Sequence, residues 1–144
     1  MWATYPEVLQ NYAKNYKTGE TIPTELVEKI LASSKFNQGY DFGEVLEAAL
    51  LDMKWHALSK DEAAAIDTPE KVSAYETKSL KDLGLEIDLV PPRYRTTYFN
   101  HIFSGPSGYS AGYYSYLWTQ MLDRDSRAWF LQNGGLTRAN GDHY

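Results

Sequence analysis

One stretch of the sequence gathers side chains that could act on a polar substrate. His101 precedes a loop rich in Gly, Ser and Pro, and Tyr109, Tyr113 and Tyr116 follow that loop. If a helix runs from Tyr109 to about Gln132, its rotation of about 100° per residue places the three phenols within an arc of about 60°. A phenol stays neutral at physiological pH because its pKa is about 10, so it can donate a hydrogen bond to an oxyanion developing on a carbonyl. The spacing therefore predicts a row of oxyanion donors.

A structural interpretation of the same residues stays open. Tyrosines at helical spacing usually pack in a core with their hydroxyls at its edge, and a histidine before a Gly-rich loop can be an ordinary loop residue. The functional interpretation adds that Gly105 and Gly108 make the loop flexible, so that it can close over a substrate. The opposite side of the expected helix is the better core face and carries Ala111, Trp118, Leu122 and Trp129.

Helix start and stop signals occur along most of the chain. Ser59 with Glu62 and Asp41 with Glu44 have the spacing of helix caps, in which each side chain bonds a free backbone N–H at the helix start. The expected helices run from Pro6 to about Tyr16, after Pro23, behind Asp41, from Ser59 to Ala65 and from Thr68 to Gly84.

The segments between and within these helices indicate one fold class. The segment from Leu85 to Arg95 should be extended, because Pro91 and Pro92 exclude helix there. Nothing alternates with period two for long enough to make a sheet, so the predicted class is all-α. The helix behind Asp41 should bury an apolar stripe made of Phe42, Val45, Leu46, Ala49, Leu50 and Met53.

Composition and charge limit the class of protein. The 144 residues make about one ordinary domain. Fourteen basic and nineteen acidic residues give a net charge of −5, which argues against nucleic acid or an anionic membrane as partner. The lack of cysteine excludes disulfides, thiolate metal sites and a cysteine nucleophile. The sequence has neither a membrane helix nor a secretory signal, so we expect a cytoplasmic protein.

Several segments, in order along nearly the whole chain, resemble the sequence motifs of one protein family. These segments are residues 2–4, 36–40, 48–56, 91–95, 101–118, 117–122 and 134–138. Together they resemble the thimet oligopeptidase-like zinc metallopeptidases, and within them the bacterial peptidyl-dipeptidase (dipeptidyl carboxypeptidase) branch. By this resemblance the chain is the helical C-terminal part of a larger, mainly α metallopeptidase.

The resemblance implies a zinc peptidase that removes dipeptides from the C-termini of oligopeptides. In that family two histidines of an H-E-x-x-H helix and a downstream glutamate bind zinc, and the glutamate of the motif activates water. Carried over to this chain, His101 is a substrate hydrogen-bonding residue. Tyr109 and Tyr116 are catalytic donors to the scissile carbonyl or the tetrahedral intermediate, and Tyr113 is a weaker candidate for substrate binding.

The zinc motif itself does not occur in these 144 residues. The histidines are His56, His101 and His143, and none begins an H-E-x-x-H sequence. We therefore expect residues 1–144 to form one helical segment, the substrate-binding part without the zinc helix or the extreme C-terminus. This segment should bind no metal and be inactive alone. The expected partners are an oligopeptide substrate and the missing zinc-bearing part.

Two further expectations concern partners and loop geometry. A second hypothesis is a non-enzymatic helical module that binds peptides or another protein through an exposed tyrosine face. Separation of a helical part from its partner should expose apolar surface, so we also expect self-association or a partner chain. Relative to the family, Pro106 and Ser107 look like an insertion between His101 and Tyr109, whereas the interval from Tyr109 to Tyr116 should be helical.

Overall fold

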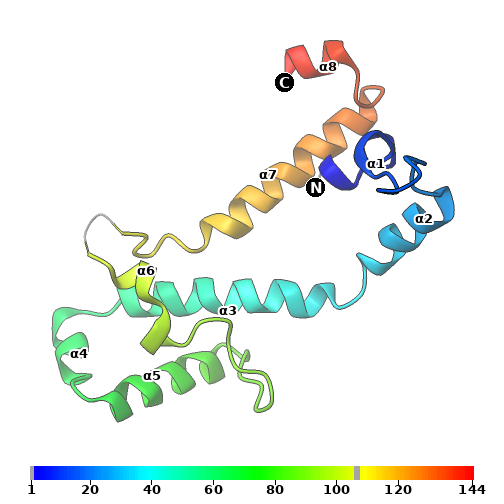
Figure 1. The fold of residues 1–144 in the computed structure, drawn as a ribbon. Helices are drawn as coiled ribbons and strands as arrows, with labels where there is room; N and C mark the ends of the chain where they lie inside the picture. Colours follow the sequence, from blue (N-terminus) through cyan, green and yellow to red (C-terminus); the bar gives the residue numbers. More distant parts are fainter. Residues whose placement is uncertain (1, 106–107) are drawn as a thin grey trace. The chain divides into compact units, whose positions relative to one another are not determined.

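A computed structural model describes residues 2–105 and 108–144 of the chain. Over these residues the regular elements are helices, with two isolated bridges, Lys14–Thr21 and Ile87–Val90, and no strand (Figure 1). The predicted all-α class is confirmed. The α-helices are α1 (Pro6–Tyr12), α2 (Thr24–Ser33), α3 (Gln38–His56), α4 (Lys60–Ala65), α5 (Pro69–Asp82), α6 (Asn100–Phe103), α7 (Ser115–Gln132) and α8 (Arg138–His143), and the 3₁₀ turns are Trp2–Thr4 and Thr96–Tyr98.

The chain forms two compact units, Met1–Tyr40 and Asp41–Tyr144, a division that the sequence interpretation does not contain. In the first unit α1 ends at Tyr12 rather than near Tyr16. The reason lies in the backbone after it, where Ile22 N donates to Ala13 O (2.9 Å) and closes a turn. This bond occupies the Ala13 carbonyl, which a longer helix would use for its own hydrogen bond.

Helix starts in the second unit largely follow the predicted caps. Ser59 and Glu62 form a complete capping box at the start of α4, and the Thr68 hydroxyl accepts a bond from Lys71 N (3.3 Å) at the start of α5. Both caps are confirmed. The predicted cap at Asp41 is wrong, because α3 begins three residues earlier, at Gln38, and Asp41 lies inside its first turn.

The core of the second unit is small and largely aromatic. Figure 1 shows α5 running back along α3, and the Tyr75 hydroxyl on α5 donates to Lys54 O on α3 (2.9 Å). The core cluster consists of Ala48, Ala49, Phe99, Ile102 and Tyr113, with Val45, Tyr94 and Leu117 packed against it.

The stripe predicted on α3 is partly wrong. Ala49 is buried as expected, but Phe42 and Met53 are 50% and 45% exposed. The buried side of α3 instead includes Leu51 and Asp52, both fully buried. A carboxylate can occupy this face because its oxygens are fully hydrogen-bonded there, as described below.

The connection between α5 and α6 has no helix over residues 85–95, as the prolines predict, but it is not extended throughout, because Val90 N donates to Ile87 O (3.0 Å) and closes a tight turn. The buried Glu76 carboxylate fixes its end, accepting bonds from Arg95 Nε (2.8 Å), Thr96 N (2.6 Å) and the Thr96 hydroxyl (2.8 Å). The same hydroxyl accepts a bond from Trp55 Nε1 on α3 (2.9 Å). This network holds the chain in place just before the segment that carries His101.

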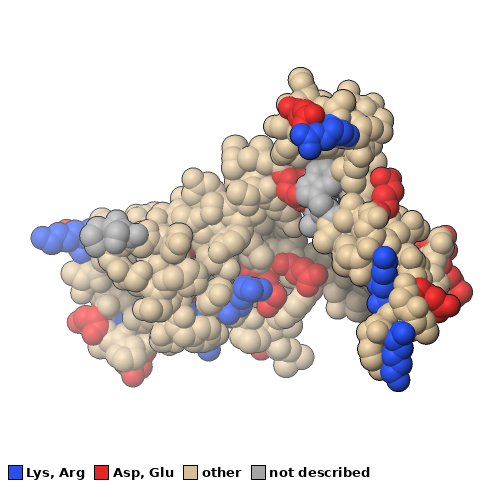
Figure 2. Space-filling model, turned by 45° about the horizontal axis from the view of Figure 1, so that its top comes forward, with Lys and Arg blue, Asp and Glu red and all other residues tan. Residues whose placement is uncertain are grey.

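Charged side chains are dispersed on the face drawn in Figure 2, where the lysines and arginines lie singly or beside acidic groups. Many pair at a spacing of four residues, as in Lys29–Glu25 (2.7 Å) and Arg138–Asp142 (2.6 Å) within one helix and Lys71–Asp67 (2.6 Å) at the start of α5. Among the helices that the structure describes, none is both long and apolar enough to cross a membrane.

Candidate functional site

The segment that carries the predicted site residues is a series of turns between two helices. α6 ends at Phe103 and α7 begins only at Ser115, so the prediction of a continuous helix from Tyr109 is wrong. Tyr109 N donates to His101 O (3.2 Å), Gly112 N donates to Tyr109 O (2.8 Å), and Ala111 has φ +54°. A left-handed alanine cannot continue an α-helix, which explains the late start of α7.

The physical cause of this turn is Asp52 on α3. Its two carboxylate oxygens accept hydrogen bonds from Ala111 N and Tyr113 N, each at 2.9 Å. The side chain of Asp52 is fully buried, so these donors replace the water that a carboxylate would otherwise bind. Asp52 is a site-forming residue that the sequence interpretation missed. Only the position of an acidic residue on the apolar side of α3 could have indicated it.

Ring contacts gather the predicted residues around His101. The half-buried His101 ring lies 5.9 Å from Tyr113 and 6.3 Å from Tyr109 between ring centroids. Tyr113 in turn lies 4.9 Å from Tyr116. The predicted residues are therefore joined by ring contacts, although Tyr109 and Tyr113 reach them from turns and His101 from the short helix α6, and their role as a substrate site stays a prediction.

Exposure separates the three tyrosines of this cluster. Tyr109 and Tyr116 are 71% and 59% exposed, whereas Tyr113 is 6% exposed and belongs to the core. Burial, followed by the neighbouring Tyr94, raises the pKa of Tyr113, so its hydroxyl keeps its proton. Tyr109 and Tyr116 are thus the phenols that a ligand can reach directly.

The backbone favours glycine at Gly105 and at Gly108 for two different geometric reasons. Gly105 has φ +105°, a conformation that side chains with a Cβ rarely adopt. At Gly108 a Cβ would lie 2.8 Å from the Ser104 hydroxyl and 3.1 Å from Gly105 O, so a larger residue would crowd both groups. The expected flexibility of these glycines stays a prediction. The predicted insertion at Pro106 and Ser107 lies outside the described residues.

The predicted core face of α7 is wrong at two of its positions. Trp118 and Leu122 are 59% and 50% exposed. The α7 residue that packs against the core cluster is Leu117 in its first turn, and Phe130 near its other end is the buried residue of the helix. The middle of α7 therefore presents an apolar surface to solvent in this chain.

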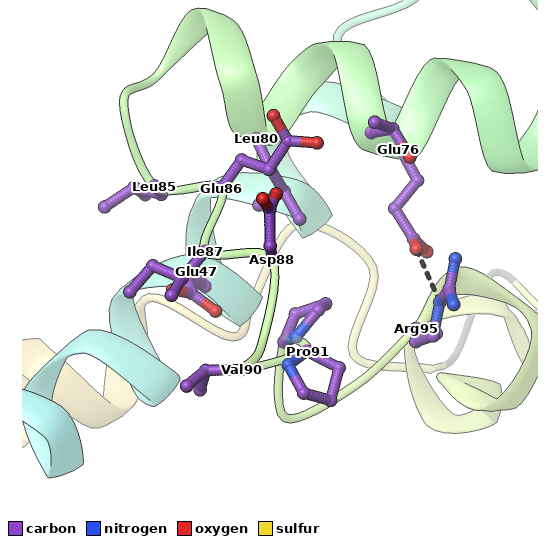
Figure 3. Close-up of a pocket in the computed structure, with 12 residues that line it drawn as sticks. Glu47, Glu76, Leu80, Leu85, Glu86, Ile87, Asp88, Val90, Pro91 and Arg95 are labelled. Atoms are coloured by element: carbon purple, nitrogen blue, oxygen red, sulfur yellow. Dashed lines mark hydrogen bonds and ion pairs between the residues drawn. The ribbon is translucent and has the colours of Figure 1, made fainter.

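A cavity of about 260 Å³ lies between α3, α5 and the connection that follows α5 (Figure 3). Its wall includes Leu80, Val90 and the ion-paired Glu76 and Arg95. Glu47 on α3 also lines it and is 6% exposed. Burial, followed by the charge of Glu44, raises the pKa of the Glu47 carboxyl.

Glu47→Gln is expected to stabilise the chain at neutral pH and to have no effect in acid. A raised pKa means that the folded state holds the proton more tightly than the unfolded state, so native stability falls as pH rises from the ordinary value of 4.5 through the raised value. Glutamine removes this loss. Urea unfolding of both chains between pH 4 and pH 8 measures it. Equal pH profiles for the native chain and Glu47→Gln would contradict it, and Glu86→Gln at the exposed rim is the matched control.

Residues 2–105 and 108–144 hold no group of three or more His, Asp or Glu residues that could bind a metal ion. The histidines of the ring cluster and of α3, His101 and His56, each lie among aromatic or hydrogen-bonding neighbours instead.

Comparison with known proteins gives the family. The sequence model of Peptidase family M3 matches residues 1–144. The chain is 49% identical over 140 residues to dipeptidyl carboxypeptidase of Escherichia coli strain K12, covering 97% of this chain and 20% of that protein. It is 48% identical over 143 residues to dipeptidyl carboxypeptidase of Salmonella typhimurium, covering 99% of this chain and 20% of that protein.

A more distant relative is oligopeptidase A of Escherichia coli strain K12, with 32% identity over 147 residues. That match covers 99% of this chain and 20% of the relative. The chain thus spans about a fifth of the length of the curated relatives it matches. A family match along the whole chain, together with its helical fold, shows that the chain belongs to peptidase family M3.

Proposed function

We propose that this chain is the substrate-binding part of a zinc metallopeptidase that releases dipeptides from the C-termini of oligopeptides. The identity to two dipeptidyl carboxypeptidases supports this activity over that of the more distant oligopeptidase A. The observation that carries the proposal is the pair of exposed phenols, Tyr109 and Tyr116, beside the His101 and Tyr113 rings.

Each residue of this cluster has a separate role in the proposal. The family's zinc, bound by residues other than these 144, would supply an activated water for attack on the peptide carbonyl. Tyr116 and Tyr109 donate hydrogen bonds to the carbonyl oxygen as negative charge develops on it. His101 bonds the substrate backbone beside them. Tyr113 keeps the rings of His101 and Tyr116 in place from the core, a more indirect contribution than direct contact with the substrate.

A second candidate function is a non-enzymatic module that binds peptides or another protein. The apolar surface on α7 favours it, since Trp118, Met121 and Leu122 are each at least half exposed. In the enzyme, the zinc-bearing part would cover such a surface. The coding sequence upstream discriminates the two functions, because an H-E-x-x-H motif in the same or an adjacent reading frame favours the enzyme.

The isolated chain is expected not to hydrolyse an N-blocked oligopeptide, with or without added zinc. Oxyanion donors lower the barrier for a nucleophile that is already activated, and no zinc motif in this sequence supplies one. Chromatography of the reaction products measures the turnover. Turnover by the pure chain that a chelator abolishes would contradict the proposal.

A further inference from the structure

We infer that Asp52 and His56 on α3 are positioning residues that hold both ends of the loop between His101 and Tyr116. The inference rests on the proposed function for its effect on catalysis, whereas its structural part stands on the contacts alone. Neither residue faces the substrate in this assignment. They act through the backbone and through Phe103.

The C-terminal end of the loop is held by charge. The Asp52 carboxylate accepts the bonds from Ala111 N and Tyr113 N at 2.9 Å. A buried carboxylate is stable only while such donors surround it, and hydrogen bonds to a charged group are stronger than neutral ones. The left-handed turn at Ala111 is therefore favoured over a helix, because it lets two backbone N–H groups bond to the buried Asp52 carboxylate.

His56 completes this arrangement. Its Nδ1 lies 2.8 Å from Asp52 Oδ1 and 2.9 Å from Asp52 O. Both neighbours only accept hydrogen bonds, so Nδ1 carries a hydrogen. The Asp52 carboxylate thus has two hydrogen-bond donors from the loop and the close His56 ring beside it, and the bond from Nδ1 to Asp52 O fixes the orientation of the imidazole ring.

The N-terminal end of the loop is held by the same imidazole. The His56 ring stacks on Phe103 of α6, with centroids 5.7 Å apart and planes inclined by 24°. His101 lies in the same short helix as Phe103. The two loop ends are also bonded to each other, since Ser110 Oγ donates to Ile102 O (3.0 Å).

The consequence concerns the geometry of the oxyanion donors. Without the Asp52 carboxylate, the turn at Ala111 loses the two hydrogen bonds that stabilise it. The helical spacing of the local sequence then favours extension of α7 toward Tyr109. Such an extension would move Tyr109 away from His101 and rotate Tyr113 out of the core. A substitution of Asp52 would then reduce catalysis through the same step as loss of Tyr116.

The structural test uses the 144-residue chain and the nearly isosteric substitution Asp52→Asn. The amide nitrogen of asparagine would face a backbone N–H, so the Ala111 and Tyr113 amides are expected to exchange with solvent at least about tenfold faster, as measured by NMR hydrogen exchange. Asp41→Asn, exposed on the same helix, is the control. Unchanged protection in Asp52→Asn would overturn the inference. If Asp52→Asn does not fold, His56→Phe, which keeps the stack on Phe103, is expected to give the same faster exchange in these two amides.

The catalytic test uses the complete zinc-bearing protein and a double-mutant cycle with Tyr116→Phe. Asp52→Asn alone is expected to lower kcat about 10²-fold, but to add little in the Tyr116→Phe background, because both changes remove the same donor geometry. Multiplied losses in the double variant would mean a general structural effect and overturn the positioning role. If the native complete protein releases no dipeptide, the proposed function fails, and hydrogen exchange alone decides whether Asp52 holds the loop.

Discussion

Tyr116→Phe is expected to lower kcat for C-terminal dipeptide release about 10²–10³-fold in the complete zinc-bearing protein, with little change in KM. The substitution removes only the hydroxyl, because the phenylalanine ring can keep the contact of 4.9 Å with Tyr113. The donor acts on charge that exists in the transition state and not in the bound substrate, so kcat is the parameter that changes. Steady-state kinetics on an N-blocked oligopeptide measures both parameters.

Tyr114→Phe is the matched control for this experiment. Tyr114 is 52% exposed and lies two residues before Tyr116 at the start of α7, but it has no assigned role. Its loss of a hydroxyl is expected to leave kcat nearly unchanged. Equal losses in the two variants, or a native kcat in Tyr116→Phe, would contradict the assignment.

Phe99→Ala is expected to destabilise the chain by about 3–5 kcal/mol, which is a large part of the stability of an ordinary domain. Phe99 is fully buried and its ring stacks on Tyr94 at 4.6 Å. It also meets the rings of Tyr113 (5.1 Å) and His101 (5.2 Å) edge to face. Removal of this ring leaves a cavity at the point where the site cluster joins the core.

Chemical unfolding followed by circular dichroism measures this loss. Tyr98→Ala is the control, since Tyr98 precedes Phe99 directly but is 53% exposed, and its cost should be about 0.5 kcal/mol. Equal costs for the two substitutions would show that Phe99 does not anchor the core. Because His101 packs on Phe99, the variant should also lose the ring contacts of the site.

Local signals in the sequence predicted much of the fold. The capping box at Ser59, the cap at Thr68 and the end of α5 before Gly84 each depend on residues within one or two turns of one another. Their bonds form whenever that stretch is helical, so a sequence shows them directly. The lack of helix at Pro91 and Pro92 followed in the same way, whereas the tight turn between Ile87 and Val90 was not predicted.

The start of α7 could not be predicted in this way. The residues that decide it, Ala111 and Tyr113, bond to Asp52 across 59 and 61 positions of the sequence. Helical spacing describes what the local backbone prefers, whereas a buried anion on another helix imposes a different conformation. The same carboxylate explains why the buried side of α3 differs from the apolar stripe that begins at Phe42.

The site could be predicted in its composition more than in its geometry. Ring contacts join His101 to Tyr109 and, through Tyr113, to Tyr116, and the family membership agrees with the comparisons. Tyr113 differs because its ring is needed to fill the core beside Phe99. The catalytic roles of the exposed phenols come from the resemblance and stay proposals.

The most direct test of the central claim is the release of C-terminal dipeptides by a mixture of this chain and the zinc-bearing part of the protein. The mixture is expected to cleave an N-blocked oligopeptide and release its C-terminal dipeptide, to need both components, and to lose about 10²–10³-fold in rate when this chain carries Tyr116→Phe. A correctly folded complex that releases no dipeptide, or an equal rate with Tyr116→Phe, would contradict the claim that this chain supplies the oxyanion donor.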